Sequence, residues 1–571
     1  MSKVLRINLT DRKHSFEDLP AACRYIGGRG LIAHVLKEEV APSIHPLGEH
    51  NKIIFACGVL AGSSVPNSGR LSVGGLSPLT KTVKESNAGG TFAQAMAKIG
   101  LRAIIVEGYA LELVGIRIDA DGVAVGSAES CRGMGNYALI EKLTEQYGAT
   151  AAIASIGPGG ENRLLSAGVS STGADREPRM AARGGLGAVM GAKNLKYVVI
   201  ENAGHDRLQI ADPAVLKAET KTFAKGLVAH PMVDGLKNFG TPLLVSVIND
   251  GVNGLATRNY RQGKFAGAAR ISGEHIAELI GARSGARAVH RCMPGCVIHC
   301  SNVFVTADKK TIVTGLEFET IALLGSNLMI DDIDAIAKMN HRCNDIGVDT
   351  MEVGAALGVA MEAGLLNWGD AEKATQMIEN MVAATGRGSM IGHGCVYAGK
   401  LLGIDRVPQV KGQGLAAYDP RGLKGTGVTY ATSPMGADHT CGNAVPNPAN
   451  PDYNPAADTG QGPVSQFLQI YHAAIDSIGL CLFASIPLLD MPALQECLIR
   501  CVCAVTGMPF DKDYLMKIGK ATLKAERAFN LAAGFTAEDD RLPAFFGEEQ
   551  LPESGNIFKV PLEELDGVHD F

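Results

Sequence analysis

The sequence predicts an α+β protein in which a β-rich N-terminal domain precedes two mainly α-helical domains. Short apolar strands separated by glycines occupy the first part of the chain, and longer helical patterns begin near residue 212. A set of four cysteines, three on a short loop and one far along the chain, ties the two helical domains together. These observations predict a site where the domains meet.

The N-terminal domain is predicted to span residues 1–205. Leu5, Ile7 and Leu9 alternate with polar neighbours, as in a half-buried strand. Further strands are expected at 52–58, 70–75, 102–108 and 196–201, and helices at 30–38, 91–99 and 137–147. The polar segment 203–213 ends this domain.

The helical domains are predicted to span residues 206–410 and 411–571, with the glycine-rich segment 411–425 between them. Helical patterns cover 212–229, 332–344, 349–365, 371–384, 464–480 and 514–533.

Composition excludes several classes of function. The net charge of -6 provides no broad basic surface, so nucleic acid is not an expected partner. No apolar stretch reaches the ~18 residues that a membrane span needs, and the first residues lack the apolar segment of a secretory signal. Thirteen cysteines in such a chain indicate reduced thiols or metal ligands rather than disulfides. We therefore expect a cytoplasmic protein.

The cysteines carry the strongest chemical signal. Cys292, Cys296 and Cys300 lie in the run RCMPGCVIHC, and Cys481 ends the run DSIGLC. A [4Fe–4S] cluster needs four thiolates, which this set supplies. Structural zinc is the alternative, but zinc sites favour cysteines separated by two residues, and here both short gaps contain three. The spacing favours a cluster.

Glycine-rich loops are the second signal. The run RGGLGAVMG (183–191) is similar to a dinucleotide-binding turn, but we expect no strand before it and reject that interpretation. Together with the loops 67–75 and 85–92 it favours a large polyanionic ligand, the alternative being ordinary turns. The polar residues and glycines concerned are Arg70, Asn87, Gly89, Gly90, Arg183 and Gly184.

A weak internal echo links the two helical domains. The runs NDIGVD (344–349) and DSIGLC (476–481) share a polar start, a glycine and an aliphatic residue at matched offsets. Six residues can recur by chance, but the echo predicts two similar turns.

Together these features resemble the aldehyde ferredoxin oxidoreductase family, tungsten enzymes with a bis-pterin cofactor. The similarity runs nearly end to end through GGRGL, SVPNSGRLSVGGLSPLT, SNAGG, ASIGPGGEN, AARGGLGAVMGAKNLK, EFETIALLG, AAYDPRG and DSIGLCLF. It implies that the N-terminal domain is a base that binds two pterins holding tungsten or molybdenum, with Mg²⁺ bridging their phosphates. It also implies oxidation of an aldehyde to a carboxylate, with electrons passing through a [4Fe–4S] cluster to ferredoxin.

The resemblance implies a role for each matching position. Glu319 and His439 would lie beside the metal as catalytic residues, and the four cysteines would hold the cluster. The implied cofactor-binding residues are Arg70, Asn87, Gly89, Gly90, Arg183, Gly184, Asn344, Asp349, Asp476, Gly479 and Leu480.

Three departures and two alternatives remain. The first gap between cysteines is one residue longer than in the family loop, and Asn344 replaces an aspartate. Lys338 occupies the position of a glutamate that, with a histidine such as His341, holds iron between subunits, so any homodimer should lack interface iron. The alternatives are a low-potential reductase of a carboxylate or aromatic thioester within a complex, and an electron carrier with a cluster only.

Overall fold

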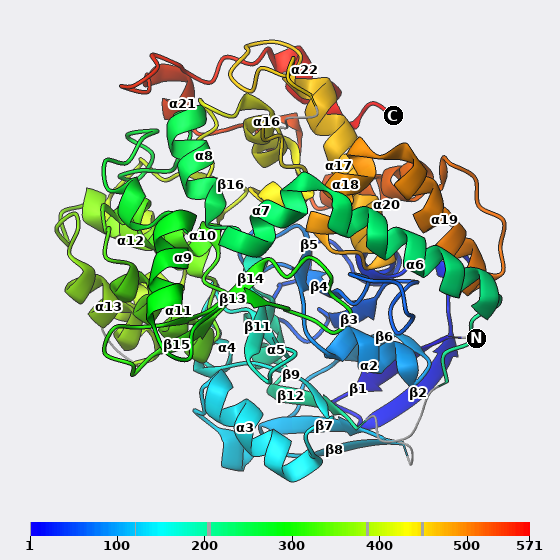
Figure 1. Ribbon diagram of the computed structural model, residues 1–571. Coiled ribbons are helices and arrows are strands. Elements are labelled where there is room, and N and C mark those ends of the chain that lie inside the picture. The colour runs from blue at the N-terminus through cyan, green and yellow to red at the C-terminus, as the bar shows by residue number, and fades with distance from the viewer. Residues whose placement is uncertain (1, 120–121, 202–206, 384–386, 447–449) are drawn as a thin grey trace.

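The computed structural model describes residues 2–119, 122–201, 207–383, 387–446 and 450–571. The prediction of an α+β fold is confirmed: two mixed sheets fill the N-terminal region and helices dominate the rest (Figure 1). The predicted boundary between residues 205 and 206 falls within residues 202–206, outside the described residues.

The first six-stranded sheet, with its helices, forms lobe 1. Its strand order is β2-β1-β6-β3-β4-β5, and β1 and β6 are its parallel pair. The elements are β1 (Lys3–Asn8), β2 (Lys13–Asp18), α1 (Gly28–Glu39), β3 (Ile53–Cys57), β4 (Leu71–Leu76), β5 (Val83–Ala88), α2 (Phe92–Lys98) and β6 (Leu101–Glu107).

The second six-stranded sheet forms lobe 2, with the order β8-β7-β12-β9-β10-β11 and β7 and β12 parallel. Its elements are β7 (Val114–Ile118), β8 (Val123–Ser127), α3 (Asn136–Tyr147), β9 (Ala152–Ser155), α4 (Pro158–Glu161), β10 (Val169–Thr172), β11 (Pro178–Ala181), α5 (Leu186–Ala192) and β12 (Leu195–Ile200).

Lobes 1 and 2 have the same topology. Strand for strand, β1 to β6 match β7 to β12 in order and direction, and α1 and α3 occupy the same place between the second and third strands. One apolar core joins the lobes, with residues such as Ile53 and Phe55 from lobe 1 and Ile116 and Val198 from lobe 2. The N-terminal domain is therefore an internal duplication.

Helices α8 to α13 of the first helical region lie on the left in Figure 1. Apart from α6 and α7, the helices of this region pack around one large core that includes Leu323 and Leu357. Its elements are α6 (Pro213–Ala229), α7 (Pro231–Phe239), α8 (Leu243–Gly251), α9 (Gly273–Ala282), β13 (Arg287–His290), β14 (Ser301–Val305), β15 (Ile312–Thr314), α10 (Phe318–Leu324), α11 (Ile333–Ile346), α12 (Thr350–Glu362), α13 (Ala371–Glu379), α14 (Arg387–Gly392) and α15 (Cys395–Leu402).

The second helical region includes the orange helices α17 to α20, on the right of Figure 1. Its elements are β16 (Gln409–Val410), β17 (Gln413–Gly414), α16 (Lys424–Thr432), the short 3-10 helix η7 (His439–Cys441), α17 (Gln461–Ile478), α18 (Leu482–Asp490), α19 (Pro492–Thr506), α20 (Tyr514–Ala532), α21 (Phe545–Glu548) and α22 (Leu562–Asp566). The helices α6, α7 and α17–α19 share a core with the cysteine loop, and this core includes Met293 and Ile298.

Each helical region sends one turn onto one lobe. Gly347 directly follows helix α11 and Gly479 directly follows α17. Both glycines have the left-handed conformation that glycine adopts without strain. The first turn lies against Gly157 of lobe 2 and the second against Gly58 of lobe 1, so closely that a Cβ on either lobe glycine would overlap backbone atoms. The runs NDIGVD and DSIGLC therefore occupy equivalent places, as the echo predicted.

One expectation about local structure is wrong. Strand β11 does precede the glycine run at 183–191, and helix α5 begins within the run, at Leu186. The strand was missed because PRMA has little β-propensity and only four residues. However, β11 pairs with β10 in the antiparallel sense at a sheet edge, so the parallel β-α-β unit of a dinucleotide fold is not formed.

No helix among the described residues is both long and apolar enough to cross a membrane.

Candidate functional site

A cavity of about 370 Å³ lies where both lobes and both helical regions meet. Most of the predicted site residues line it: Arg70, Asn87, Gly89, Arg183, Cys292, Cys300, Glu319, Asn344, Asp349, Asp476, His439 and Cys481. The other predicted residues, Gly90, Gly184, Cys296, Gly479 and Leu480, are outside this lining. The fold thus brings together segments from almost the whole chain.

Cys292, Cys296, Cys300 and Cys481 lie close enough in space to affect one another's pKa values. Burial, followed by the neighbouring thiols of Cys292 and Cys481, raises the pKa of Cys296 to about 12. Burial also raises the pKa of Cys300, with Glu317 and the other three thiols adding to the effect. Among the described residues, no three His, Cys, Asp or Glu side chains are grouped closely enough for a single metal ion. The four thiols thus influence one another without forming a single-ion site among the described residues.

The cysteine loop is attached to lobe 1 through Asn67. Its Nδ2 atom donates to Sγ of Cys296 at 3.4 Å, and its Oδ1 atom accepts the Val297 N–H at 3.1 Å. The Asn67 carbonyl accepts the N–H of Cys481 at 2.8 Å. One residue therefore holds both the loop and the distant cysteine. Gly89 lies so close to this loop that a Cβ would come within 2.9 Å of Cys292 Sγ.

The turn on lobe 1 carries buried charges. Arg29 is fully buried and donates to both carboxylate oxygens of Glu526, at 2.7 and 2.8 Å, and lies 3.5 Å from Asp476. Burial raises the pKa of Asp476, and the nearby carboxylate of Glu85 adds to this, against the opposing charges of Arg29 and Arg70. Arg70 donates to Asn87 Oδ1, which leaves part of its guanidinium facing the cavity.

The turn on lobe 2 is organised by Arg183. Its Nε atom donates to Asp349 Oδ2 at 3.2 Å, and its two terminal nitrogens donate to the carbonyls of Ala437 at 2.9 Å and Gly414 at 2.6 Å. Burial lowers its pKa, but Asp349, Asp438 and other carboxylates outweigh this and raise it. Arg183 is therefore a fixed cation that joins lobe 2 to both helical regions.

Glu319 and His439 both line the cavity and lie next to each other. Nε2 of His439 lies 3.2 Å from Oε1 of Glu319, and Oε2 of Glu319 accepts the Ala417 N–H at 2.8 Å. Burial raises the pKa of Glu319, although His439, the Ala417 N–H and Arg183 oppose this. Within the described part of the chain, Oε1 of Glu319 and Nδ1 of His439 are buried without a hydrogen-bond partner. Such atoms are free to meet a ligand.

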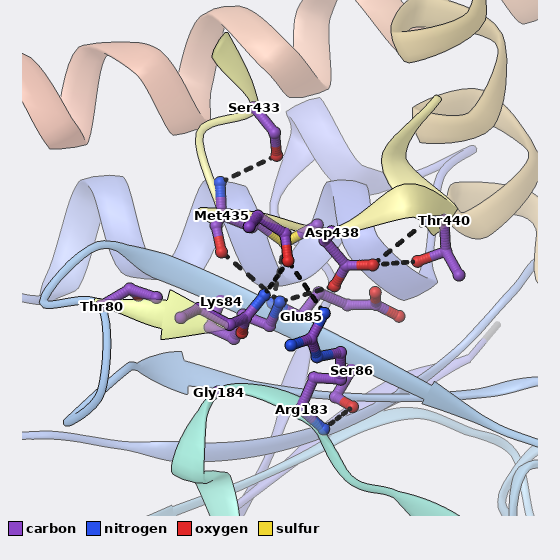
Figure 2. A network of polar contacts seen from close by, with 12 residues as sticks. Thr80, Lys84, Glu85, Ser86, Arg183, Gly184, Ser433, Met435, Asp438 and Thr440 are labelled. Carbon is purple, nitrogen blue, oxygen red and sulfur yellow. Dashed lines mark hydrogen bonds and ion pairs between the residues drawn. The ribbon is translucent and has the colours of Figure 1, made fainter. Parts of the chain in front are cut away.

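A buried ion pair supports the segment that carries His439. Lys84 of β5 lies 2.7 Å from Asp438, the residue before His439, and Figure 2 shows both side chains pointing toward each other. Burial opposes the charge on Asp438, but Lys84, Arg183 and His439 hold its pKa well below the usual range. The pair joins lobe 1 to the wall opposite Glu319.

Sequence reasoning missed several polar residues of the lining: Glu85, Arg179, Glu317, Tyr418 and Asp438. Arg179 donates to Glu177 at 3.0 Å and to Ser301 at 3.1 Å, and its Nη2 atom is buried without a partner among the described residues. These residues occur in ordinary polar surroundings in the sequence. The available signal was proximity in the sequence, because Glu85, Glu317 and Asp438 lie within two residues of the predicted residues Asn87, Glu319 and His439.

Two family models together match nearly the whole chain. The N-terminal domain of aldehyde ferredoxin oxidoreductase matches residues 4–202, and domains 2 and 3 of the same family match residues 219–567.

Curated relatives agree with the family models. The tungsten-containing aldehyde ferredoxin oxidoreductase of Pyrococcus horikoshii is 34% identical, with 97% of this chain and 92% of the relative covered. The WOR-like subunit of an aliphatic sulfonate oxidoreductase from Pyrococcus furiosus is 24% identical over 98% of this chain and 92% of the relative. The fold also matches the solved active-site complex BamBC of benzoyl coenzyme A reductase, with a TM-score of 0.79, 20% identity and coverage of 100% and 97%. The chain therefore belongs to the aldehyde ferredoxin oxidoreductase family.

Proposed function

We propose that this protein is a tungsten- or molybdenum-pterin oxidoreductase that oxidises an aldehyde to a carboxylate. The observation that carries the proposal is the single cavity that unites Glu319 and His439 with the residues of both turns and with three of the four cysteines. The relatives that are one-third identical carry tungsten and aldehyde in their names.

The residues of the cavity fit an anionic, bis-pterin cofactor. Arg70 and Arg183 are cations at the two turns, and the duplicated lobes offer two equivalent places for two similar groups. On this proposal Asp476, Gly479 and Leu480 would bind one pterin, and Asn344 and Asp349 the other. Asn87, Gly89, Gly90, Arg183 and Gly184 would lie near the phosphates and their Mg²⁺.

The cysteines fit a cluster beside that cofactor. Cys292, Cys296, Cys300 and Cys481 supply the four thiolates of a [4Fe–4S] cluster. Gly89 and Arg70, on the cofactor side, lie next to Cys292 and Cys481 respectively. Electrons could thus leave the cavity directly into the cluster.

The bound metal would supply the two-electron acceptor, and the protein groups would handle substrate and protons. We assign Glu319 as the general base for water, because burial raises its pKa and so makes its carboxylate a stronger base, and because its Oε1 atom lacks a hydrogen bond. His439 would donate a hydrogen bond from Nδ1 to the substrate carbonyl, stabilising charge that develops there. An aldehyde and water thereby give a carboxylic acid, two protons and two electrons.

Ferredoxin, or a similar low-potential carrier, is the proposed electron acceptor. The charges of Lys237 and Arg291 both act on His299 of the cysteine loop, and both side chains are exposed. They offer a positive surface beside the cluster for an acidic carrier. If the protein dimerises, we expect no interface iron, because Lys338 pairs with Asp308 at 2.9 Å and supplies no carboxylate ligand.

Elemental analysis of anaerobically purified protein tests the cofactor assignment. We expect about one tungsten or molybdenum and about four irons per chain, the content of one cubane. Iron without either heavy metal, from cells supplied with both, would favour an electron carrier. Zinc alone would contradict the cluster.

The role of Glu319 is tested with Glu319→Gln, using aldehyde-dependent viologen reduction as the assay. We expect kcat to fall by roughly 10²–10⁴ with metal content unchanged. Glu317→Gln is the matched control: Glu317 lines the same cavity, but hydroxyls of Thr241 at 2.6 Å and Ser301 at 3.1 Å already bind its oxygens. Turnover of Glu319→Gln within a few-fold of the native protein would overturn the assignment.

A further inference from the structure

The segment 433–441, which carries His439, has no regular structure except the short η7 helix at its end. It is held instead by side chains from distant parts of the chain. Asn530 donates to the Pro434 carbonyl at 2.7 Å, Gln413 to the Ala437 carbonyl at 2.6 Å, and the His472 ring lies 3.1 Å from the Thr440 carbonyl. The position of His439 therefore depends on tertiary contacts rather than on a helix or strand.

Asp438 is the centre of these contacts. Its Oδ1 atom accepts the N–H of Thr440 at 3.1 Å and the Thr440 hydroxyl at 2.8 Å, which shapes the turn around His439. Its Oδ2 atom lies 2.7 Å from Nζ of Lys84. Oδ1 of Asp438 thus stabilises the turn itself, and Oδ2 links the turn to strand β5, as Figure 2 shows.

The Lys84 side chain starts from strand β5 of lobe 1 and is buried along its whole length. It passes against Gly184, where a Cβ would come within 2.4 Å of Lys84 Cγ. Gly184 has a φ of 82°, a conformation that also favours glycine. The ammonium group further lies 3.5 Å from the Met435 carbonyl. A buried lysine is costly unless paired, so its place here needs a reason beyond packing.

Other charged and polar side chains near Asp438 could pull its carboxylate out of place if Lys84 were absent. Arg183 and His439 both act on the Asp438 carboxylate. Without Lys84, this carboxylate would be drawn toward the Arg183 guanidinium. That movement would disturb the 3.2 Å approach of His439 to Glu319.

We propose that Lys84 is a positioning residue that holds His439 in place through Asp438. The claim that Lys84 affects catalysis rests on the proposed function. The claim that Lys84 holds residues 435–441 in place does not.

Hydrogen–deuterium exchange on the holoenzyme tests the structural content. In Lys84→Met we expect amide exchange to rise at least about tenfold across 435–441, because the turn loses its anchor. Lys196→Met is the matched control: Lys196 is equally buried and pairs with Glu161, but lies in lobe 2 away from the cavity lining. Unchanged exchange in Lys84→Met, or the same rise in the control, would overturn the proposal whatever the activity.

A second variant covers the case in which Lys84→Met does not fold. The double variant Lys84→Met with Asp438→Asn leaves no unpaired buried charge and should restore stability. We expect exchange across 435–441 to stay raised in it, because the cross-link to β5 is still missing. Native exchange in this double variant would show that the ion pair is not the anchor.

A double-mutant cycle tests the catalytic consequence. Lys84→Met should lower kcat about 10–100-fold, with KM changed less than about threefold. In a His439→Ala background the same substitution should lower kcat less than about threefold, because Lys84 acts only through His439. Additive losses would show that Lys84 acts elsewhere. If His439→Ala itself keeps full turnover, the proposed function fails, and the exchange result still decides the role of Lys84.

Discussion

The close contact between Gly58 and the turn that ends α17 leads to a specific prediction for Gly58→Ala. A Cβ at this position would lie 2.0 Å from the Ile478 carbonyl oxygen and 2.2 Å from the Gly479 nitrogen. Both are backbone atoms, so rotation of a side chain cannot relieve the overlap. Contact becomes ordinary at 3.4 Å, so the turn must move away from lobe 1 by roughly 1.4 Å.

This displacement would break specific bonds. The Arg70 N–H donates to the Gly479 carbonyl at 3.2 Å, and the Cys481 N–H to the Asn67 carbonyl at 2.8 Å. Overpacking and the loss of two hydrogen bonds should together lower the free energy of unfolding by about 2–5 kcal/mol. Ligands of a metal site must stay within about 0.5 Å of their positions, and Cys481 would move further than that.

The assay is metal content per chain together with the EPR signal of the reduced cluster. In Gly58→Ala we expect iron to fall by at least about half, because a cubane lacking one of its four thiolates is poorly held. Gly157→Ala makes the equivalent overlap on lobe 2, where a Cβ would lie 2.2 Å from the Ile346 carbonyl oxygen. It should lower tungsten or molybdenum and leave iron in place.

Gly126→Ala is the neutral control, because a Cβ there meets nothing within 4 Å. Full iron in Gly58→Ala, or an equal loss of iron in Gly157→Ala, would refute the reasoning that only the turn on lobe 1 positions a cluster cysteine.

Three further predictions concern charge. Burial raises the pKa of Glu319, and a general base acts only when it is deprotonated. The kcat should therefore fall as the pH falls through that raised pKa. In Glu319→Gln this acid limb of the pH–rate profile should vanish. Lys237→Glu should slow reduction of ferredoxin, most strongly at low salt, while viologen reduction stays native; equal loss with both acceptors would contradict a docking role. Arg29→Met leaves Glu526 buried without its cation and should lower the free energy of unfolding by roughly 3–5 kcal/mol, measured by denaturant titration.

Much of the fold could be predicted because its elements carry local patterns. The alternation at Leu5, Ile7 and Leu9 predicted a strand where β1 forms, and the apolar face at 464–480 predicted a helix within three residues of the limits of α17. The echo between 344–349 and 476–481 predicted two similar turns for the same reason, because an αL glycine after a helix has a sequence signature. Each of these patterns is contained in a short stretch of sequence, so it can be recognised without the tertiary structure.

The duplication of the N-terminal domain escaped prediction because the lobes share topology without obvious sequence similarity. Equivalent strands such as β5 and β11, VKESNA and PRMA, differ in length and chemistry. Buried charges escaped for a related reason. Nothing in the sequence around Lys84 or Arg29 shows that each is buried against a carboxylate several hundred residues away. Their partners are fixed only by the complete tertiary structure.

The docking of two distant turns onto the lobes determines when the site can exist during synthesis. Lobes 1 and 2 leave the ribosome first, yet Asp349 can reach lobe 2 only after helices α6 to α11 are made, and Cys481 reaches lobe 1 later still. Glu526, which neutralises Arg29, is made later again. The proposed metal centre, held by residues of these segments, would therefore be inserted into a nearly complete chain. Once inserted, it would join the earliest and latest parts of the chain and stabilise the folded state by its own binding energy.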